Sequence, residues 1–294
     1  MRKRSVLAVV AAASLWGLMG LFVRRCTAAG LGSLETTQLR ITVGLLLVGL
    51  YLILFHREKL RIRWRDLWCF LGTGIVSLLL FSYCYFRTKS MVSLAVAGVL
   101  LYTAPVFVML LSILLFRERM TLAKVLALVM AVVGCTLVSG VGSGESVQLS
   151  GILLGLGAGF FYALYSIFSR YAIQRGYDSW TITFYTFLFC AAGCALVCDW
   201  QAIETAVSSD HGLWPWVLAM GLTTGFGAYL LYTWGLQRIE SSRASILASV
   251  EPVVAALVGV FVFGETISLA GAAGIVLVLG AIVVLSLPKS VNNP

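Results

Sequence analysis

Apolar runs of membrane-crossing length follow one another along almost the whole sequence, separated by short segments that hold most of the charged and turn-forming residues. A helix needs about 20 apolar residues to cross a bilayer, and it satisfies its own backbone hydrogen bonds there. Ten runs are close to this length, near residues 5–24, 34–55, 67–87, 91–116, 122–140, 151–170, 179–198, 214–236, 242–263 and 267–287. The sequence therefore predicts an all-α membrane protein with ten transmembrane helices.

The composition excludes several other classes of protein. Hydrophobic residues make up 60% of the chain and charged residues 11%, against about 25% charged residues in a soluble domain. No soluble domain is left to carry the net charge of +9 as a basic patch, so nucleic acid is not an expected partner. The expected partners are the lipid bilayer and a small-molecule substrate. The seven cysteines show no ligand-like spacing to either histidine, so we expect no metal and no other cofactor.

The positive charges alternate between the segments that join the runs. Most of the 21 lysines and arginines fall in the N-terminal segment and in every second loop, whereas the loops between hold Arg24, Arg25, Arg87 and Lys89. Positive residues mark the cytoplasmic side of a membrane protein. The bias predicts a multi-pass protein of the cell (inner) membrane with an even number of crossings and both termini in the cytoplasm.

The sequence repeats itself at an offset of 147 residues. Pro105 then aligns with Pro252 and Glu118 with Glu265, and chance alone rarely pairs two of only five prolines inside apolar runs. Each unit holds five runs, and because five is odd the second unit enters the membrane from the opposite side. Inverted repeats of this kind suit alternating access, because each half can adopt the conformation of the other.

The segments that carry these pairs resemble the two copies of the EamA domain. They read LLYTAPVFVMLLSILLFRERMT at 100–121 and ILASVEPVVAALVGVFVFGETIS at 246–268. Over essentially its whole length the chain resembles the drug/metabolite transporter superfamily, with one five-helix EamA repeat at 1–147 and an inverted one at 148–294. The resemblance implies export or exchange of small metabolites, amino acids or drugs through a central cavity.

Prolines and acids inside or beside the runs are candidate functional residues. A proline removes a helical hydrogen bond, so Pro105 and Pro252 are candidate hinges beside the cavity or, alternatively, static kinks. A carboxylate within a span is costly, so Glu251 is a candidate for substrate binding and proton coupling, unless it only accepts hydrogen bonds from a neighbouring helix. Glu118 and Glu265 are expected to be structural acids that satisfy free N–H groups at the start of a helix.

Arg40 is the one cation well inside a run, six residues from its start. It would lie about 9 Å deep and could snorkel to the headgroups, the favoured interpretation, or bind a substrate carboxylate. The resemblance implies that the first, third, fourth, sixth, eighth and ninth helices surround the cavity, which would suit an amphipathic, aromatic or cationic solute. The candidate substrate-binding residues are Trp16, Tyr85, Tyr102, Tyr162, Tyr232, Trp234, Ser249 and Glu251.

Together these observations predict a secondary active or facilitative transporter that exports or exchanges a small organic solute by alternating access. The alternatives are a lipid flippase or scramblase, whose groove would be polar along its length, and a membrane-embedded enzyme. An enzyme is not expected, because both His56 and His211 fall in loops and no catalytic group is assembled. No Walker motif is present, so bound ATP is not expected to drive transport. The solute, the direction of transport, the coupling ion and the choice between monomer and homodimer stay open.

Overall fold

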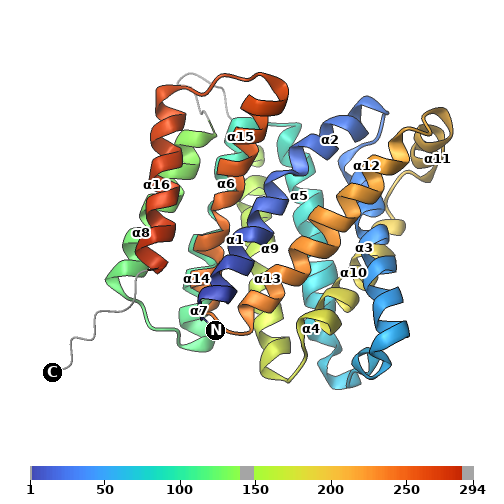
Figure 1. Ribbon diagram of the computed structural model, residues 1–294, viewed down its shortest axis with the longest axis horizontal. Coiled ribbons are helices and arrows are strands. Elements are labelled where there is room, and N and C mark those ends of the chain that lie inside the picture. Colours follow the sequence, from blue (N-terminus) through green and yellow to red (C-terminus); the bar gives the residue numbers. More distant parts are fainter. Residues whose placement is uncertain (1, 140–148, 287–294) are drawn as a thin grey trace.

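The computed structural model describes residues 2–139 and 149–286, and every regular element within them is helical (Figure 1). The first half contains α1 (Arg2–Gly17), α2 (Met19–Ala28), α3 (Ser33–Phe55), η1 (Arg57–Leu60), η2 (Trp64–Asp66), α4 (Leu67–Leu71), η3 (Gly72–Leu79), α5 (Leu80–Lys89), α6 (Leu94–Leu101), α7 (Ala104–Phe116) and α8 (Leu122–Val138). The second half contains α9 (Leu149–Gln174), α10 (Ser179–Ala195), α11 (Trp200–Ser209), α12 (Leu213–Met220), η4 (Gly221–Gly227), α13 (Ala228–Leu236), α14 (Ser241–Ala248), α15 (Val250–Phe263) and α16 (Leu269–Ser286). The predicted repeat boundary between residues 147 and 148 lies outside the described residues.

The helices confirm the all-α prediction for the described residues, where each predicted apolar run contains one or more helices. Among the described residues, six helices are long and apolar enough to cross a membrane: Lys3–Ala28, Ser33–Phe55, Trp64–Lys89, Ala95–Phe116, Leu149–Gln174 and Ser241–Phe263. A seventh span results if α10 and α11, which are bent by 100° relative to each other, count as one. α8 and the apolar stretch of α16 are shorter. The protein is therefore a multi-pass membrane protein, and the count of ten crossings stays a prediction.

Helices of one half pack on helices of the other in a recurring pattern. α1 packs on α13 as α9 packs on α5, and α3 packs on η4 as α10 packs on η3. η3 and η4 are π-helical segments inside longer helices, and each approaches its neighbour at a glycine. A Cβ on Gly74 would lie 2.7 Å from the carbonyl oxygen of Thr186, and one on Gly221 would lie 2.4 Å from Val43 Cβ. Small residues at these crossings let the backbones come close.

α8 and α16 form a pair at one edge of the bundle, on the left in Figure 1. They cross at two glycines, because a Cβ on Gly274 would lie 2.5 Å from the carbonyl oxygen of Gly134. The cavities described below are lined by residues from other helices. The functional site therefore lies in the main bundle, beside this pair rather than within it.

Candidate functional site

A cavity of about 360 Å³ lies between α1, α2, α3, α5, α6, α9, α13 and α15. It extends from the middle of the bundle to one end, because its lining includes Ser33, the first residue of α3, and Lys89, the last residue of α5. This volume falls at the small end of the range of about 300–1,000 Å³ that is usual for small-molecule sites. Its aromatic lining consists of Trp16, Phe81, Tyr85, Phe86, Tyr102, Tyr162 and Tyr229.

Glu251 supplies the one carboxylate that lines the cavity within the described residues. It stands in the first turn of α15, where the free N–H groups of a helix favour negative charge. Its Oε2 accepts a hydrogen bond of 3.3 Å from the hydroxyl of Tyr162. Tyr85 and Tyr102 line the same cavity. This arrangement can hold a cation beside the carboxylate and the ring faces, or a proton on the carboxylate.

Arg40 lines the cavity from α3, and only 6% of its surface is exposed. Its Nη1 lies 3.8 Å from the sulfur of Met19, a weak acceptor, and its Nε has no hydrogen-bond partner among the described residues. The snorkelling interpretation of Arg40 is therefore wrong. The side chain is enclosed within the bundle and borders the cavity.

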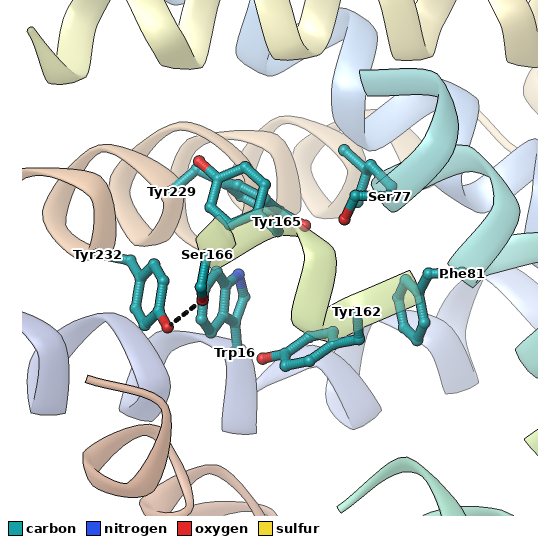
Figure 2. Close-up of a pocket in the computed structure, with 9 residues that line it drawn as sticks. Trp16, Ser77, Phe81, Tyr162, Tyr165, Ser166, Tyr229 and Tyr232 are labelled. Atoms are coloured by element: carbon teal, nitrogen blue, oxygen red, sulfur yellow. Dashed lines mark hydrogen bonds between the residues drawn. The ribbon is translucent and has the colours of Figure 1, made fainter. Parts of the chain in front are cut away.

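A layer of aromatic rings, drawn in Figure 2, lines a second, smaller space beside the cavity. It lies on the side away from the open end, because its lining residue Ser77 precedes Phe81, which lines both spaces, whereas Lys89 at the open end follows Phe81. Its centre is Trp16, whose ring centroid lies 5.1 Å from that of Tyr229, 5.3 Å from that of Tyr232 and 6.3 Å from that of Tyr162. Tyr232 shares a hydrogen bond of 2.8 Å with Ser166, drawn as the dashed line in Figure 2. The space left among these side chains is about 20 Å³, room for about one water molecule. A solute therefore cannot pass this layer in the structure described.

Beyond the aromatic layer, Glu118 of the first half binds the N-terminus of α14 in the second half. Its carboxylate accepts hydrogen bonds from the backbone N–H of Ser241 at 2.9 Å, from that of Ser242 at 3.4 Å and from the Ser242 hydroxyl. Lys124 Nζ lies 3.5 Å from the Glu118 carboxylate and 2.9 Å from that of Glu240. Every residue of α14 is buried. These contacts hold the two halves together at this end of the bundle.

Glu265, at the matching position of the second half, makes a different contact. It forms an ion pair with Arg24, and half of its side chain is exposed. The sequence had suggested that each acid caps the helix that follows it, but neither does. Nearby hydroxyl groups cap those helices instead. Thr121 accepts from a backbone N–H in the first turn of α8, and Ser268 does the same for α16. The two ends of the bundle therefore differ: one is joined by buried contacts, and the other leads into the cavity.

Pro105 and Pro252 stand in the first turns of α7 and α15, each just after a break in the helical run. Proline is tolerated at a helix start because its missing N–H would have no partner there. Tyr102 lies at the first break and Glu251 directly before Pro252, so both breaks border the cavity. The role of the prolines as hinges stays a prediction.

The structure brings most of the predicted substrate-binding residues to the cavity walls. Of the predicted residues, the larger cavity is lined by Trp16, Tyr85, Tyr102, Tyr162 and Glu251. The smaller space is lined by Trp16, Tyr162 and Tyr232. Trp234 and Ser249 line neither space. Each of them is two residues from a lining residue, and positions two apart point to different sides of a helix.

Sequence reasoning missed several lining residues, although their spacing could have identified them. Tyr229 lies three residues before Tyr232, and Phe81 and Lys89 lie four residues on either side of Tyr85. Residues three or four apart share a helix face. Because Tyr85 and Tyr232 were predicted to line the cavity, the same spacing predicts that these neighbours line it too.

Comparison with known proteins gives the class of the chain. The profile of the EamA-like transporter family matches residues 3–140 and again residues 149–287. These matches cover nearly the whole sequence, so the chain belongs to the EamA-like transporter family. This membership is consistent with the drug/metabolite transporter superfamily.

Individual relatives are similar over nearly their full length. The chain is 30% identical over 277 residues to an "Uncharacterized transporter" of Archaeoglobus fulgidus, with 94% of both proteins covered. It is 27% identical to "Uncharacterized transporter YwfM" of Bacillus subtilis, with 96% of this chain and 93% of the relative covered. A solved structure described only as "Crystal structure of protein" superposes with a TM-score of 0.80 over 97% of both chains at 21% identity, a likeness of fold alone.

Proposed function

We propose that the protein is a secondary active or facilitative transporter that exports or exchanges a small organic solute by alternating access. The observation that carries this proposal is the 360 Å³ cavity, built from both halves of the chain and reaching only one end of the bundle. A carrier needs such a chamber, because the solute must never have a path open to both sides at once. Membership of the EamA-like family and relatives named as transporters support the proposal.

We further propose that the chain crosses the cell (inner) membrane ten times, in two inverted repeats at residues 1–147 and 148–294. Both termini then lie in the cytoplasm. The matched packing of α1 on α13 and of α9 on α5 supports this arrangement, as do the two profile matches. Reporter tags test it directly. A tag at residue 1 and a tag at residue 145 should report opposite compartments, and tags on the same side would contradict the inverted arrangement.

The repeat also suggests how the alternate state forms. At the offset of 147 residues, Ser241 at the start of α14 corresponds to Leu94 at the start of α6. If the halves exchange conformations, Glu265 binds the N-terminus of α6 and Glu118 releases α14. Pro105 and Pro252 then act as the hinges, because each follows a break between the helices that must move.

Transport itself is tested in proteoliposomes. Purified protein should exchange one or more labelled amino acids or organic cations across the membrane. An excess of the same unlabelled solute should reduce the exchange of the label. Labelled phospholipid in the same vesicles tests the flippase alternative. Lipid transfer without solute exchange would refute the transporter proposal in favour of a flippase or scramblase.

Glu251 is the proposed site of proton coupling, because it is the carboxylate of the cavity. Glu251→Gln keeps the shape of the side chain and removes its charge. The variant should fold and should lose the pH dependence that the wild type shows in an exchange assay across a pH series. An unchanged pH profile would exclude Glu251 as the proton carrier and leave facilitative exchange.

A further inference from the structure

The loop that follows α3, residues 56–66, concentrates positive charge. It carries a lysine or an arginine at every second position from residue 57 to residue 65. The segment at the matching place in the second half, residues 204–212, contains no lysine or arginine. The loop joins the spans Ser33–Phe55 and Trp64–Lys89, so it lies at a membrane surface. It lies at the closed end of the bundle, because the opposite end of α3 borders the mouth of the cavity.

Two of the five cations have acidic partners. Lys59 Nζ lies 2.7 Å from the carboxylate of Asp178, and Arg63 Nε lies 2.9 Å from that of Asp66. Asp66 also pairs with Arg175, which follows α9, at 3.0 Å. These ion pairs connect the loop to the second half of the chain and account for the charges of Lys59 and Arg63.

Hydrogen bonds from the second half hold the backbone of the loop as well. The hydroxyl of Tyr185 donates to the carbonyl oxygen of Leu60 at 2.6 Å, and the hydroxyl of Tyr177 accepts from the backbone N–H of Arg63 at 3.0 Å. A loop held in this way presents its remaining side chains from a fixed backbone. Less conformational entropy is then lost when those side chains bind a partner.

The other three cations, Arg57, Arg61 and Arg65, are exposed and form no ion pair with a carboxylate of the described chain. Arg57 donates through Nε to the carbonyl oxygen of Ile53, and the guanidinium of Arg65 lies 6.0 Å from the ring centroid of Trp64. Neither contact neutralises a charge. The counter-ions of these three arginines therefore come from outside the described chain.

The neighbours of the three arginines show what surrounds them. The side chains of Leu54 and Phe55, at the end of α3, are exposed, and so are those of Trp64 and Trp68 at the start of the next span. Exposed apolar side chains on a membrane span face acyl chains, and tryptophan is enriched at the level of the headgroups. The arginines therefore lie at the headgroup level, directly beside acyl chains.

We propose that Arg57, Arg61, Arg65 and Trp64 form a binding site for an anionic phospholipid. The guanidinium groups bind its phosphate, whose oxygens match the planar fork of arginine. The tryptophan ring packs against its glycerol and the first part of its acyl chains. A phospholipid supplies the phosphate and the apolar chains together, whereas a soluble acidic partner would leave the apolar neighbours of the arginines uncovered.

Lipid binding to the purified full-length protein tests this inference. Detergent micelles that hold the protein receive either phosphatidylglycerol or phosphatidylcholine, and native mass spectrometry measures the bound lipid. An arginine near an anionic lipid surface strengthens binding about 5-fold, so phosphatidylglycerol should bind on the order of 10- to 100-fold more tightly than phosphatidylcholine. Phosphatidylglycerol should also raise the melting temperature by mass action. Equal binding of the two lipids by the wild type would overturn the proposal.

Two double variants show whether the lipid recognises a site or only the charge of this end of the bundle. Arg61→Gln with Arg65→Gln should weaken the binding of phosphatidylglycerol about 25-fold. The matched control is Arg117→Gln with Arg119→Gln, which removes two exposed cations after α7 at the same end. The control should bind phosphatidylglycerol within about 3-fold of the wild type. Equal losses in the two double variants would overturn the proposal, because the lipid would then respond to net charge alone.

A soluble phosphate ligand is the other source of the same chemistry. Glycerol phosphate, which lacks acyl chains, should not raise the melting temperature of the wild type at concentrations where phosphatidylglycerol does. An equal rise would assign the arginines to a soluble ligand and overturn the lipid site. These measurements require no transport, so the failure of the lipid site would leave the transporter proposal standing, and the reverse also holds.

Discussion

Glu118 is the buried acid that joins the two halves at the closed end of the bundle, and its loss should open that end. Glu118→Gln keeps the size of the side chain but removes its charge. The carboxylate accepts three hydrogen bonds at the start of α14, from Ser241 and Ser242. A charged acceptor makes each such bond stronger than a neutral one by about 1 kcal/mol.

Three bonds therefore give an expected destabilisation of the closed contact of about 2–3 kcal/mol. Lys124 is expected to add little to this figure, because its ammonium keeps the contact of 2.9 Å with Glu240. A change of this size shifts the equilibrium between closed and open forms about 30- to 150-fold. The matched control is Glu265→Gln at the other end, where an exposed ion pair with Arg24 contributes only about 0–1 kcal/mol.

Hydrogen exchange of the α14 backbone measures this opening directly. In lipid nanodiscs, the peptide that covers Ser241–Ala248 should exchange about 30- to 150-fold faster in Glu118→Gln than in the wild type. The same peptide should exchange within about 5-fold of the wild-type rate in Glu265→Gln. Unchanged exchange of α14 in Glu118→Gln would refute the reasoning, because the carboxylate would then not hold the helix.

Three further predictions follow from the packing and the loops. Gly274→Ala should lower the stability of the fold by about 1–3 kcal/mol in chemical unfolding, because the new Cβ would meet the α8 backbone, whereas Gly157→Ala, with no atom within 4 Å of its Cβ, should not lower it. Trp16→Phe should cost about 1 kcal/mol in the same assay, since its Nε1 donates to a buried carbonyl at 3.1 Å. Burial opposes the charge of Asp178, but hydrogen bonds from Lys59 and the backbone outweigh it and hold the pKa of this carboxyl below its usual value. Its stabilisation is then present above about pH 4 and is lost as the pH falls through the lowered pKa, so Asp178→Asn should flatten the acid limb of a melting-temperature profile.

The sequence was a sufficient guide to the helices and to many of the cavity residues. Hydrophobic runs predicted every long helix, because a bilayer leaves the chain few other structures. The tyrosines of the cavity were found because they lie deep in runs that the family resemblance places around a cavity. The repeat pairs, such as Pro105 with Pro252, pointed to the breaks that border the cavity.

Other features could not be read from the chain. Glu118 and Glu265 occupy matching positions in the sequence, yet one is buried on α14 and the other is half exposed beside Arg24. A repeat describes what the halves share, whereas a conformation open at one end requires them to differ. The burial of Arg40 was missed for a related reason. The position of a residue along a helix does not show whether its side chain faces the bundle or the lipid.

The sequence by itself determined that the chain is helical, lies in a membrane and consists of two related halves, because hydropathy and repetition are properties of neighbouring residues along the chain. Only the tertiary structure decided which charges meet. Arg40 and Glu251 are more than 200 residues apart and border one cavity, and which end of that cavity is closed depends on contacts between helices of opposite halves. Such contacts arise from packing in three dimensions, which no local pattern encodes.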